Sequence, residues 1–441
     1  MKSERQKMTM LEAITEAKRC LRCKVPLCRK GCPISNDIPD WIHELSMGNL
    51  GNAMAIINAK SNLPAVCSRV CAHERQCEGN CVLGKKDRCV SIGRLERFVS
   101  DFDNSMGLIR RPIVQKDRGR VAVIGSGPSG LTVAGILARA GFAVDIFEME
   151  PQPGGVLMFG IPEYRLPKDV VTREIDKIRQ LGVNIHCNMT AGVDFTIDEL
   201  LAKGYDAMFI GTGTGKPKEL NIPGIHVEGV RRAIYFLRRF SLYRSGFLSR
   251  EELPVDSTDT VFVVGCGNTA MDAARTARRC GARQVSVIYH RGIENMSALR
   301  SEYDEAVSEG VKFLWNTNLL GCYPDETGKV TSIRIKDAAG EIIELKATKV
   351  LMAIGSAPAT RIISTTGGIE VDDGCYVRTG RDPYGMTSKM GVFAGGDVAR
   401  RTATVVHAMQ DAQKVAEGII KYVDAVRLLA RIKEGIGIVH E

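Results

Sequence analysis

Residues 120–148 have the sequence RVAVIGSGPSGLTVAGILARAGFAVDIFE, and this stretch decides the fold class. An apolar run, Val121–Ile124, leads into a turn with glycines at positions 125, 127 and 130, and a second apolar run ends on Glu148. This order predicts a strand, a glycine turn, a helix, a second strand and an acid. In such a unit the glycines permit a tight turn, close approach of a pyrophosphate and close packing of helix on strand.

The stretch therefore predicts a dinucleotide site, with a purely structural glycine turn as the alternative. Glu148 follows Gly125 by about twenty residues, the spacing at which a carboxylate accepts the ribose hydroxyls of a dinucleotide. The residues predicted to bind here are Gly125, Gly127, Pro128, Ser129, Gly130 and Glu148.

A second copy of the pattern begins at residue 260 and predicts a second nucleotide-binding unit. Its expected parts are a strand (Thr260–Val264), a glycine turn (Gly265, Gly267, Asn268, Thr269, Ala270), a helix (Met271–Cys280) and a strand (Val285–Tyr289). The second strand is followed by His290 and Arg291 instead of an acid. A guanidinium pairs with a 2′-phosphate that a carboxylate would repel, so this ending favours NADPH over NADH. Arg300 is a weaker candidate, and the alternative for all three is a solvent-facing charge.

Size, charge and cysteine usage restrict the class of protein. The chain has 441 residues, 44% of them hydrophobic, which suits two to four globular domains. No apolar targeting segment or membrane-length apolar run occurs, so we expect a cytoplasmic location and no membrane contact. Residues 1–120 hold 22 Lys and Arg against 13 Asp and Glu, but no aromatic residues are interleaved as in a nucleic-acid site. We therefore expect no nucleic acid partner.

Nine of the fourteen cysteines precede residue 90, and eight of them form two runs. The runs are Cys20-x2-Cys23-x4-Cys28-x3-Cys32 and Cys67-x3-Cys71-x5-Cys77-x3-Cys81, with Pro33 after the first. Eight thiols in two runs suit two four-iron clusters. Zinc, which usually takes two short C-x2-C pairs, and disulfides or inert thiols are the alternatives.

Apolar periodicity predicts the remaining elements. We expect helix at Met10–Ala17, over Asp37–Ile57, over Val170–Leu181 and from about Val406; strands at Val183–Cys187, Ala207–Gly213 and Gly391–Asp397; sheet within 330–355; a linker at Arg110–Gly119; and a flexible stretch from Gly155 to Pro167.

These motifs, together with CVSIGRLERF (89–98), GIPEYRL (160–166), GCGNTAMD (265–272) and AGGD (394–397), resemble the small subunit of NADPH-dependent glutamate synthase. The same architecture is found in the N-terminal part of dihydropyrimidine dehydrogenase and in the large subunit of NADH-dependent ferredoxin:NADP oxidoreductase. The resemblance implies FAD at the first glycine turn and NADPH at the second. It also implies cofactor contacts from Gly154, Gly155, Arg165, Gly355, Gly396, Asp397, Thr404 and Val405.

The resemblance further implies a crossed set of cluster ligands. Cys20, Cys23, Cys28 and Cys81 would hold one cluster; Cys32, Cys71, Cys77 and Glu96 would hold the other. For Glu96 the alternative is an ordinary solvated charge. Cys67 matches a family motif without being one of its ligands, and Cys89 has no assigned role.

The predicted fold is α/β, with two nested, glutathione-reductase-like Rossmann domains after an α-helical iron–sulfur domain. The expected domains are residues 1–115 for iron–sulfur, 116–223 with 356–441 for FAD, and 224–355 for NADPH. The expected function is NADPH-dependent electron transfer through FAD and two 4Fe-4S clusters, with no side chain acting as acid, base or nucleophile. The runner-up is the electron-input subunit of a ferredoxin-linked or bifurcating complex or of a dihydropyrimidine dehydrogenase.

Two other functions fit the sequence less well. A disulfide reductase needs a cysteine pair beside the flavin, whereas the cysteines after residue 90 are scattered. A non-catalytic scaffold would not need the intact glycine turns and cysteine runs. Because no glutaminase nucleophile or 2-oxoglutarate site can be placed in this chain, we expect it to be one component that passes electrons to a larger catalytic or electron-accepting subunit.

Overall fold

The computed structural model describes residues 7–108, 114–218, 220–359, 361–401 and 404–437. The chain forms two compact units. Unit 1 comprises Met1–Leu157, Leu166–Gly215 and Pro358–Glu441, and unit 2 comprises Met158–Arg165 and Lys216–Ala357. Residues 110–113 of the predicted linker lie outside the described residues. None of the described helices is both long and apolar enough to cross a membrane.

Unit 1 contains a five-stranded parallel sheet with the order β15-β4-β1-β2-β3. Its strands are β1 (Arg120–Ile124), β2 (Ala143–Phe147), β3 (Val183–His186), β4 (Ala207–Ile210) and β15 (Val392–Ala394). The strands are short and rich in apolar residues, as in parallel sheets covered on both faces. The order reverses beside β1, and ligands of such sheets bind outside the carboxyl ends of the strands at this reversal.

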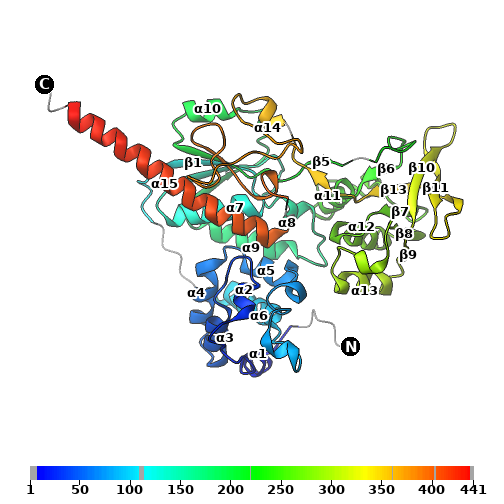
Figure 1. The fold of residues 1–441 in the computed structure, drawn as a ribbon, viewed down its shortest axis with the longest axis horizontal. Coiled ribbons are helices and arrows are strands. Elements are labelled where there is room, and N and C mark those ends of the chain that lie inside the picture. The colour runs from blue at the N-terminus through cyan, green and yellow to red at the C-terminus, as the bar shows by residue number, and fades with distance from the viewer. Residues whose placement is uncertain (1–6, 109–113, 219, 360, 402–403, 438–441) are drawn as a thin grey trace. The chain divides into compact units, whose positions relative to one another are not determined.

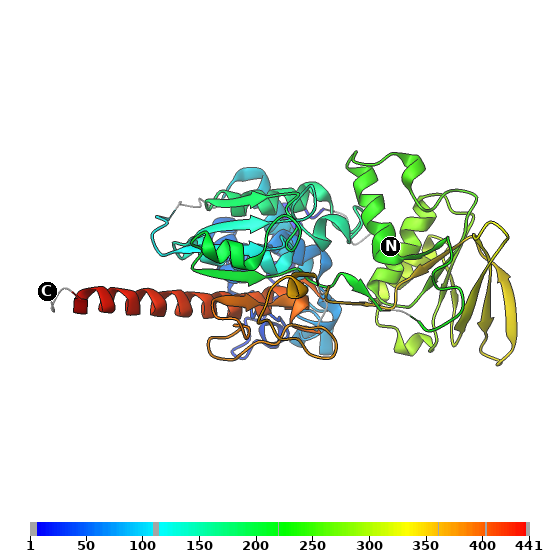
Figure 2. The same cartoon turned by 90° about the horizontal axis from the view of Figure 1, so that it is seen from above.

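Helices of unit 1 cover this sheet, and the long α15 packs along α7 (Figures 1 and 2). The helices are α7 (Pro128–Arg139), α8 (Val156–Phe159, with its first two residues in unit 1), α9 (Lys168–Arg179), α10 (Ile197–Ala202), α14 (Arg361–Ser364) and α15 (Val405–Gly437), with the short turn η5 (Gly396–Val398) before α15.

Unit 2 contains a second five-stranded parallel sheet with the order β6-β13-β7-β8-β9, in which β13-β7-β8-β9 repeats the arrangement of β4-β1-β2-β3, while the edge strand β6 precedes the others in the chain, whereas β15 follows them. Its strands are β6 (Val230–Arg232), β7 (Thr260–Val264), β8 (Gln284–Ile288), β9 (Lys312–Leu314) and β13 (Lys349–Met352). Its helices are α11 (Ala233–Arg244), α12 (Asn268–Arg279) and α13 (Arg300–Ser308), with the turns η3 (Arg250–Glu252) and η4 (Ile293–Asn295). An antiparallel sheet of β10 (Asn318–Pro324), β11 (Val330–Lys336) and β12 (Ile342–Lys346) shares a core with the parallel sheet, and β5 (Lys216–Pro217) pairs with β14 (Ser356–Ala357).

The cysteine-rich segment of unit 1 consists of short helices and loops in its described part, residues 7–108. The helices are α1 (Met10–Ala17), α2 (Leu27–Lys30), α3 (Ile38–Ser46), α4 (Leu50–Lys60), α5 (Pro64–Val70) and α6 (Ile92–Met106), with the turns η1 (His73–Arg75) and η2 (Val82–Lys85). Its core is built around Trp41, which is 1% exposed. Apart from Cys67 in the middle of α5, the cysteines of this segment lie in loops, turns or the short helix α2.

The structure corrects two local expectations. The single helix expected over Asp37–Ile57 is two helices, because Gly48 adopts a positive φ of 82° that ends the first one. The stretch from Gly155 to Pro167, expected to be flexible, contains α8 and buries Leu157, Phe159 and Leu166. The predicted insertion at 224–355 falls inside unit 2, which also takes in residues 158–165.

Candidate functional site: two nucleotide turns and a cysteine-lined cavity

The first glycine turn connects β1 to α7, and each of its glycines has a distinct steric role. Gly125 has a φ of 94°, and a Cβ there would lie 2.8 Å from the Gly211 oxygen. A Cβ on Gly130 would lie 1.9 Å from the Gly125 oxygen, so this glycine lets α7 approach the strand. Gly127 faces open space. The turn thus leaves room for a ligand at the amino end of α7, where Pro128 and Ser129 begin the helix without a side-chain cap.

Glu148, directly after β2, is held against this turn. It is 4% exposed, and its Oε2 accepts hydrogen bonds from the backbone N–H (2.9 Å) and the hydroxyl of Ser126. Its Oε1 accepts from the Glu150 N–H at 2.9 Å. The carboxylate is therefore fixed where the ribose of a bound dinucleotide is expected.

Ser126 was not predicted as a site residue, because the middle position of G-x-G carries no sequence signal. Its hydroxyl also accepts a hydrogen bond from the Gly154 N–H at 2.8 Å. A Cβ on Gly155 would lie 2.9 Å from the Gly127 Cα. The predicted pair Gly154 and Gly155 is thus brought to the first glycine turn.

Asp397 lies in η5, just beyond β15, and its Oδ1 is buried without a hydrogen-bond partner among the described residues. Burial, with a smaller contribution from Asp411, raises the pKa of Asp397 to about 7. Gly396 packs on Ser129, where a Cβ would meet the hydroxyl at 2.8 Å. A buried acceptor without a donor beside the first turn fits a hydroxyl-bearing ligand such as the ribityl chain of FAD.

The last two predicted residues of this group start α15. Thr404 is exposed and its hydroxyl lies 2.6 Å from Nδ1 of His407. Val405 is half-buried as the first residue of α15.

Arg165 lies in unit 2, where the buried Asp272 and the half-buried Glu302 hold it. Its Nη1 is 2.7 Å from Oδ2 of Asp272, and its Nε is 2.9 Å from Oε1 of Glu302. Tyr164 lies beside it under the guanidinium of Arg275, 4.4 Å from the ring centroid. Sequence reasoning gave Arg165 a place along the flavin but missed these partners, because neither acid is near it in sequence.

The second glycine turn connects β7 to α12 in unit 2. Gly265 has a φ of 119°, and a Cβ there would lie 2.4 Å from the Ala353 oxygen. A Cβ on Gly267 would have the Ser297 hydroxyl as its nearest neighbour, at 3.4 Å. Ala270 occupies the position of the third glycine of the first turn and is fully buried. The Asn268 side chain accepts from the Leu299 N–H at 3.0 Å, which ties the start of α12 to the loop before α13. Thr269 is exposed on the first turn of α12.

The strand ends of unit 2 carry the remaining predicted residues. His290 and Arg291 are exposed and follow β8. Arg300 is exposed and its Nε lies 2.9 Å from Oδ1 of Asp304, so an intrahelical acid already neutralises it. Gly355, after β13, has a φ of 96° and its oxygen accepts from the Lys218 N–H.

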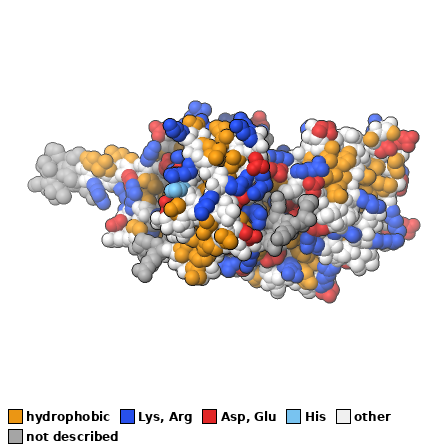
Figure 3. Space-filling view, turned by 90° about the horizontal axis from the view of Figure 1, so that it is seen from below, with side chains coloured by type: hydrophobic (Ala, Val, Ile, Leu, Met, Phe, Trp, Pro, Cys, Tyr) orange, Lys and Arg blue, Asp and Glu red, His pale blue; other side chains and the backbone are white. Residues whose placement is uncertain are grey.

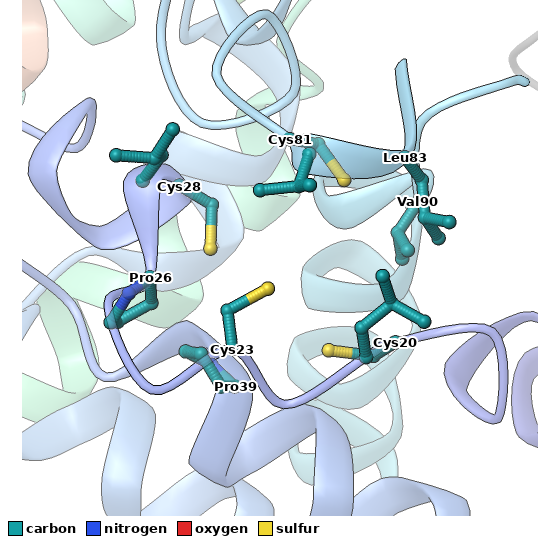
Figure 4. A pocket seen from close by; sticks show the side chains of 11 residues that line it. Cys20, Cys23, Pro26, Cys28, Pro39, Cys81, Leu83 and Val90 are labelled. Carbon is teal, nitrogen blue, oxygen red and sulfur yellow. The ribbon is translucent and has the colours of Figure 1, made fainter. Parts of the chain in front are cut away.

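Four of the predicted cluster ligands line one cavity (Figure 4). Figure 4 shows Cys20, Cys23, Cys28 and Cys81 around this cavity, with apolar walls that include Pro26, Pro39, Leu83 and Val90. Burial, followed by the neighbouring thiols Cys20 and Cys81, raises the pKa of Cys28 to about 11. A site that holds thiols but disfavours their negative charge fits a cationic group bound by thiolates.

The second predicted ligand set is also brought together. Burial raises the pKa of Cys32 and Cys77, and the hydrogen bond with Cys67 followed by burial raises that of Cys71. The charge of Glu96, on α6, contributes further to all three, so this carboxyl is a neighbour of each thiol. Burial, and then Glu174, raise the pKa of Glu96 itself to about 8. Glu96 is therefore no ordinary solvated charge, and its environment suits a carboxyl that meets a cation.

Zinc and disulfides remain to be compared with this geometry. All fourteen cysteines are free thiols. Across the described residues, no three His, Cys, Asp or Glu side chains are placed to share one metal ion. The four sulfurs instead surround a cavity, which suits a cluster because each thiolate of a four-iron cluster ligates a different iron.

Two family models match the chain. Residues 1–108 match the model described as dihydropyrimidine dehydrogenase domain II, 4Fe-4S cluster, and residues 119–412 match pyridine nucleotide-disulphide oxidoreductase. The glutamate synthase [NADPH] small chain of Escherichia coli (strain K12) is 35% identical over 436 residues, covering 94% of this chain and 92% of that one. The chain belongs to the glutamate synthase small-chain family.

Other relatives agree with this assignment, and solved structures share the fold. The small chain of Halomonas elongata is 36% identical over 440 residues, covering 94% of this chain and 91% of that one. The Escherichia coli (strain K12) NAD-dependent dihydropyrimidine dehydrogenase subunit PreT is 30% identical over 417 residues, covering 94% and 95%. Mycobacterium tuberculosis FprA in complex with NADPH shares the fold, with a TM-score of 0.58, 21% identity and coverage of 71% and 86%.

Thioredoxin reductase of T. acidophilum also shares the fold, with a TM-score of 0.54, 20% identity and coverage of 69% of this chain and 98% of that one. The predicted fold class and family are confirmed. The chain is an oxidoreductase of the glutamate synthase small-chain type, with a 4Fe-4S domain followed by a pyridine nucleotide oxidoreductase domain.

Proposed function

We propose that this small-chain protein takes electrons from NADPH at a bound FAD and passes them through two 4Fe-4S clusters to a larger partner subunit. The observation that carries the proposal is the cavity lined by Cys20, Cys23, Cys28 and Cys81, in the same compact unit as the Glu148 nucleotide turn. When bound, NADPH, FAD and the clusters supply the hydride and electron chemistry. The protein binds, orients and tunes these groups.

In unit 1, we assign the first turn to FAD. The amino end of α7 receives the pyrophosphate, Glu148 accepts from the ribose hydroxyls, and the unpartnered Oδ1 of Asp397 accepts from a ribityl hydroxyl. The burial of both carboxylates strengthens these hydrogen bonds, because little water competes for them.

In unit 2, we assign the second turn to NADPH, with Arg291 and His290 placed to contact the 2′-phosphate. The relatives differ in the coenzyme for which they are named: the glutamate synthase small chains are named for NADPH, and PreT is named for NAD. The choice in this chain therefore depends on the residues after β8, where no acid follows the strand.

The cluster segment is docked on the flavin segment inside unit 1 by buried polar contacts. Lys177 on α9 lies 3.1 Å from Oδ2 of Asp103 on α6, and Oε2 of Glu174, also on α9, accepts a hydrogen bond from the Ala65 N–H at 3.3 Å. Cys67, which hydrogen-bonds the predicted ligand Cys71, lies 3.6 Å from the sulfur of Met409 on α15. These contacts favour a fixed distance between the FAD and the second cluster, as single-electron transfer requires.

The electron acceptor is proposed to be a larger subunit of the glutamate synthase type, in the cytoplasm. Relatives are named as small chains or subunits, so a larger component belongs to their enzymes. The basic excess of residues 1–120, 22 Lys and Arg against 13 Asp and Glu, suits an encounter with an acidic surface.

The isolated, cofactor-loaded chain tests this proposal. NADPH should bleach its flavin and reduce an artificial dye with no partner present, while glutamine and 2-oxoglutarate should yield no glutamate. The Cys20→Ser variant should keep dye reduction and lose electron transfer to the larger subunit. Glutamate formation by the chain alone would contradict the proposal.

A further inference from the structure

Helix α15 has two parts with different surroundings. Up to Val423, its apolar residues at helical spacing face the body of unit 1: Met409, Ala412, Ala416, Ile419 and Val423 are at most 1% exposed. Beyond that point the helix runs past the rest of unit 1 (Figures 1 and 2). The ion pairs of Asp424 with Arg118 and of Arg427 with Asp206 mark the end of the docked part.

The part beyond Asp424 nevertheless remains rich in large apolar residues. Leu428, Leu429 and Ile432 are 59%, 58% and 47% exposed. At about 100° per residue they lie on a face roughly 180–280° around the helix from Ile419, away from the stripe that the body covers. Figure 3 shows hydrophobic side chains at the surface of this end of the helix. The exposed face is therefore not an extension of the buried stripe, and its three apolar side chains do not pack into the core of unit 1.

This arrangement is typical of a helix that docks in a groove of another molecule. Leu428 and Ile432 are spaced i, i+4, and Leu429 and Ile432 are spaced i, i+3, which are spacings at which an amphipathic helix places its anchors in a groove. An isolated helical extension of this length is marginal in water, and a contiguous exposed apolar face is uncommon on a monomer.

The charged residues around the exposed apolar face indicate which kind of partner would bind it. Lys421, Arg431 and Lys433 flank the three apolar residues and are exposed. A second copy of the chain would bring identical basic residues together, and like charges oppose such pairing. Residues 424–433 contain no Trp, Tyr or Phe, the residues that usually anchor a helix at a membrane surface. An acidic, apolar-lined groove on a protein partner satisfies both features.

We propose that Leu428, Leu429 and Ile432 dock α15 into an acidic-rimmed groove of the larger subunit. This rests on the proposed function only in its assumption of a larger subunit. The contact would hold the partner independently of the nucleotide turns and the cluster cavity, none of which involves these residues.

The test uses the full-length, cofactor-loaded chain with the triple variant Leu428→Gln, Leu429→Gln, Ile432→Gln, in which glutamine keeps helix propensity. The matched control replaces three exposed apolar residues elsewhere, Val193→Gln, Val307→Gln and Ile342→Gln. The affinity for the large chain of glutamate synthase from the same organism is measured by analytical ultracentrifugation, with NADPH–dye reduction as the check on folding. The single variant Leu429→Gln is measured in the same way.

We expect the triple variant to bind the large chain at least tenfold more weakly, with dye reduction unchanged and the control variant within twofold of wild type. The single variant should fall between them, and wild-type affinity should decrease with salt. If wild type binds the large chain and the triple variant binds equally well, the inference is overturned while the proposed function stands. If wild type does not bind the large chain at all, the proposed partner itself fails.

Two further measurements identify the other possible occupants. Concentration-dependent dimerisation of wild type that the triple variant abolishes would overturn the inference in favour of a second copy. Sedimentation of wild type, but not of the variant, with vesicles of phosphatidylglycerol and phosphatidylcholine would overturn it in favour of a lipid surface.

Discussion

The two sheets of the molecule have the same arrangement of four neighbouring strands, β4-β1-β2-β3 and β13-β7-β8-β9, with a strand, glycine turn and helix at the centre of each, but different residues follow β2 and β8. After β2, Glu148 is buried and held by Ser126; after β8, the equivalent residue is Tyr289, followed by the exposed His290 and Arg291. The same backbone turn therefore suits the pyrophosphate of either nucleotide. The comparison teaches that the glycines build the turn, while the residues at the next strand end select the ligand.

The third position of each turn offers the largest expected effect. In the Gly130→Ala variant the new Cβ would lie 1.9 Å from the Gly125 oxygen, so α7 must move away from β1. We expect loss of bound FAD and a destabilisation of about 2–3 kcal/mol, as for other overpacked cores. FAD absorbance and thermal unfolding measure these effects.

The opposite change in the second turn provides the control. Ala270 is already fully buried there, and Ala270→Gly should cost only about 1 kcal/mol, chiefly from helix propensity. Retention of stoichiometric FAD by the Gly130→Ala variant would show that the two turns are not sterically different.

The strand ends separate the coenzymes. If Arg291 pairs with the 2′-phosphate, Arg291→Ala should weaken NADPH by about 1.5–3 kcal/mol, the range for hydrogen bonds to charged groups, and leave NADH unchanged. Steady-state KM values for both coenzymes in dye reduction measure this. The matched control is Arg300→Ala, because Arg300 is already paired with Asp304. An equal loss for both coenzymes would mean that Arg291 only supports the fold.

A smaller effect sharpens the flavin side of the comparison through Asp397. Its pKa is raised by burial from 3.8 to about 7, so the ionised form is disfavoured in the folded, flavin-free protein. The stability contribution of this carboxyl is therefore lost as pH rises from about 4 to about 7, and at pH 8 Asp397→Asn should stabilise the flavin-free chain by up to about 4 kcal/mol.

At pH 4 the flavin-free variant and wild type should unfold at similar temperatures. With FAD bound, the same variant should bind the cofactor more weakly, because an amide is a poorer acceptor than a carboxylate. A pH-independent difference between the two proteins would remove Asp397 from this role.

Much of this architecture could be predicted because it depends on local sequence. β7 occupies the residues predicted for it, and α9 and α12 lie within a few residues of their predicted bounds. The partners of Arg165, by contrast, are Asp272 and Glu302, which only the folded chain brings to it. The antiparallel pairing of β10 and of β12 with β11 was also missed, because alternation of apolar residues indicates a strand but not which strand pairs with it.

The cluster ligands show the same division. Cysteine spacing predicts that two clusters exist, but it does not place Cys81 with Cys20, Cys23 and Cys28 across the intervening helices. That pairing came from the family resemblance, and the cavity brings the four side chains together. Ser126 was missed for a different reason. Its role depends on the backbone geometry of the turn, and most residue types can occupy its position.

The most direct test of the central claim is the iron and acid-labile sulfide content of the anaerobically prepared chain. Two four-iron clusters predict about eight irons and eight sulfides per chain. The Cys20→Ser variant should lose about half of each, while Cys187→Ser, which changes a thiol outside both ligand sets, should lose neither. Stoichiometric zinc without sulfide, or full iron content in Cys20→Ser, would contradict the account.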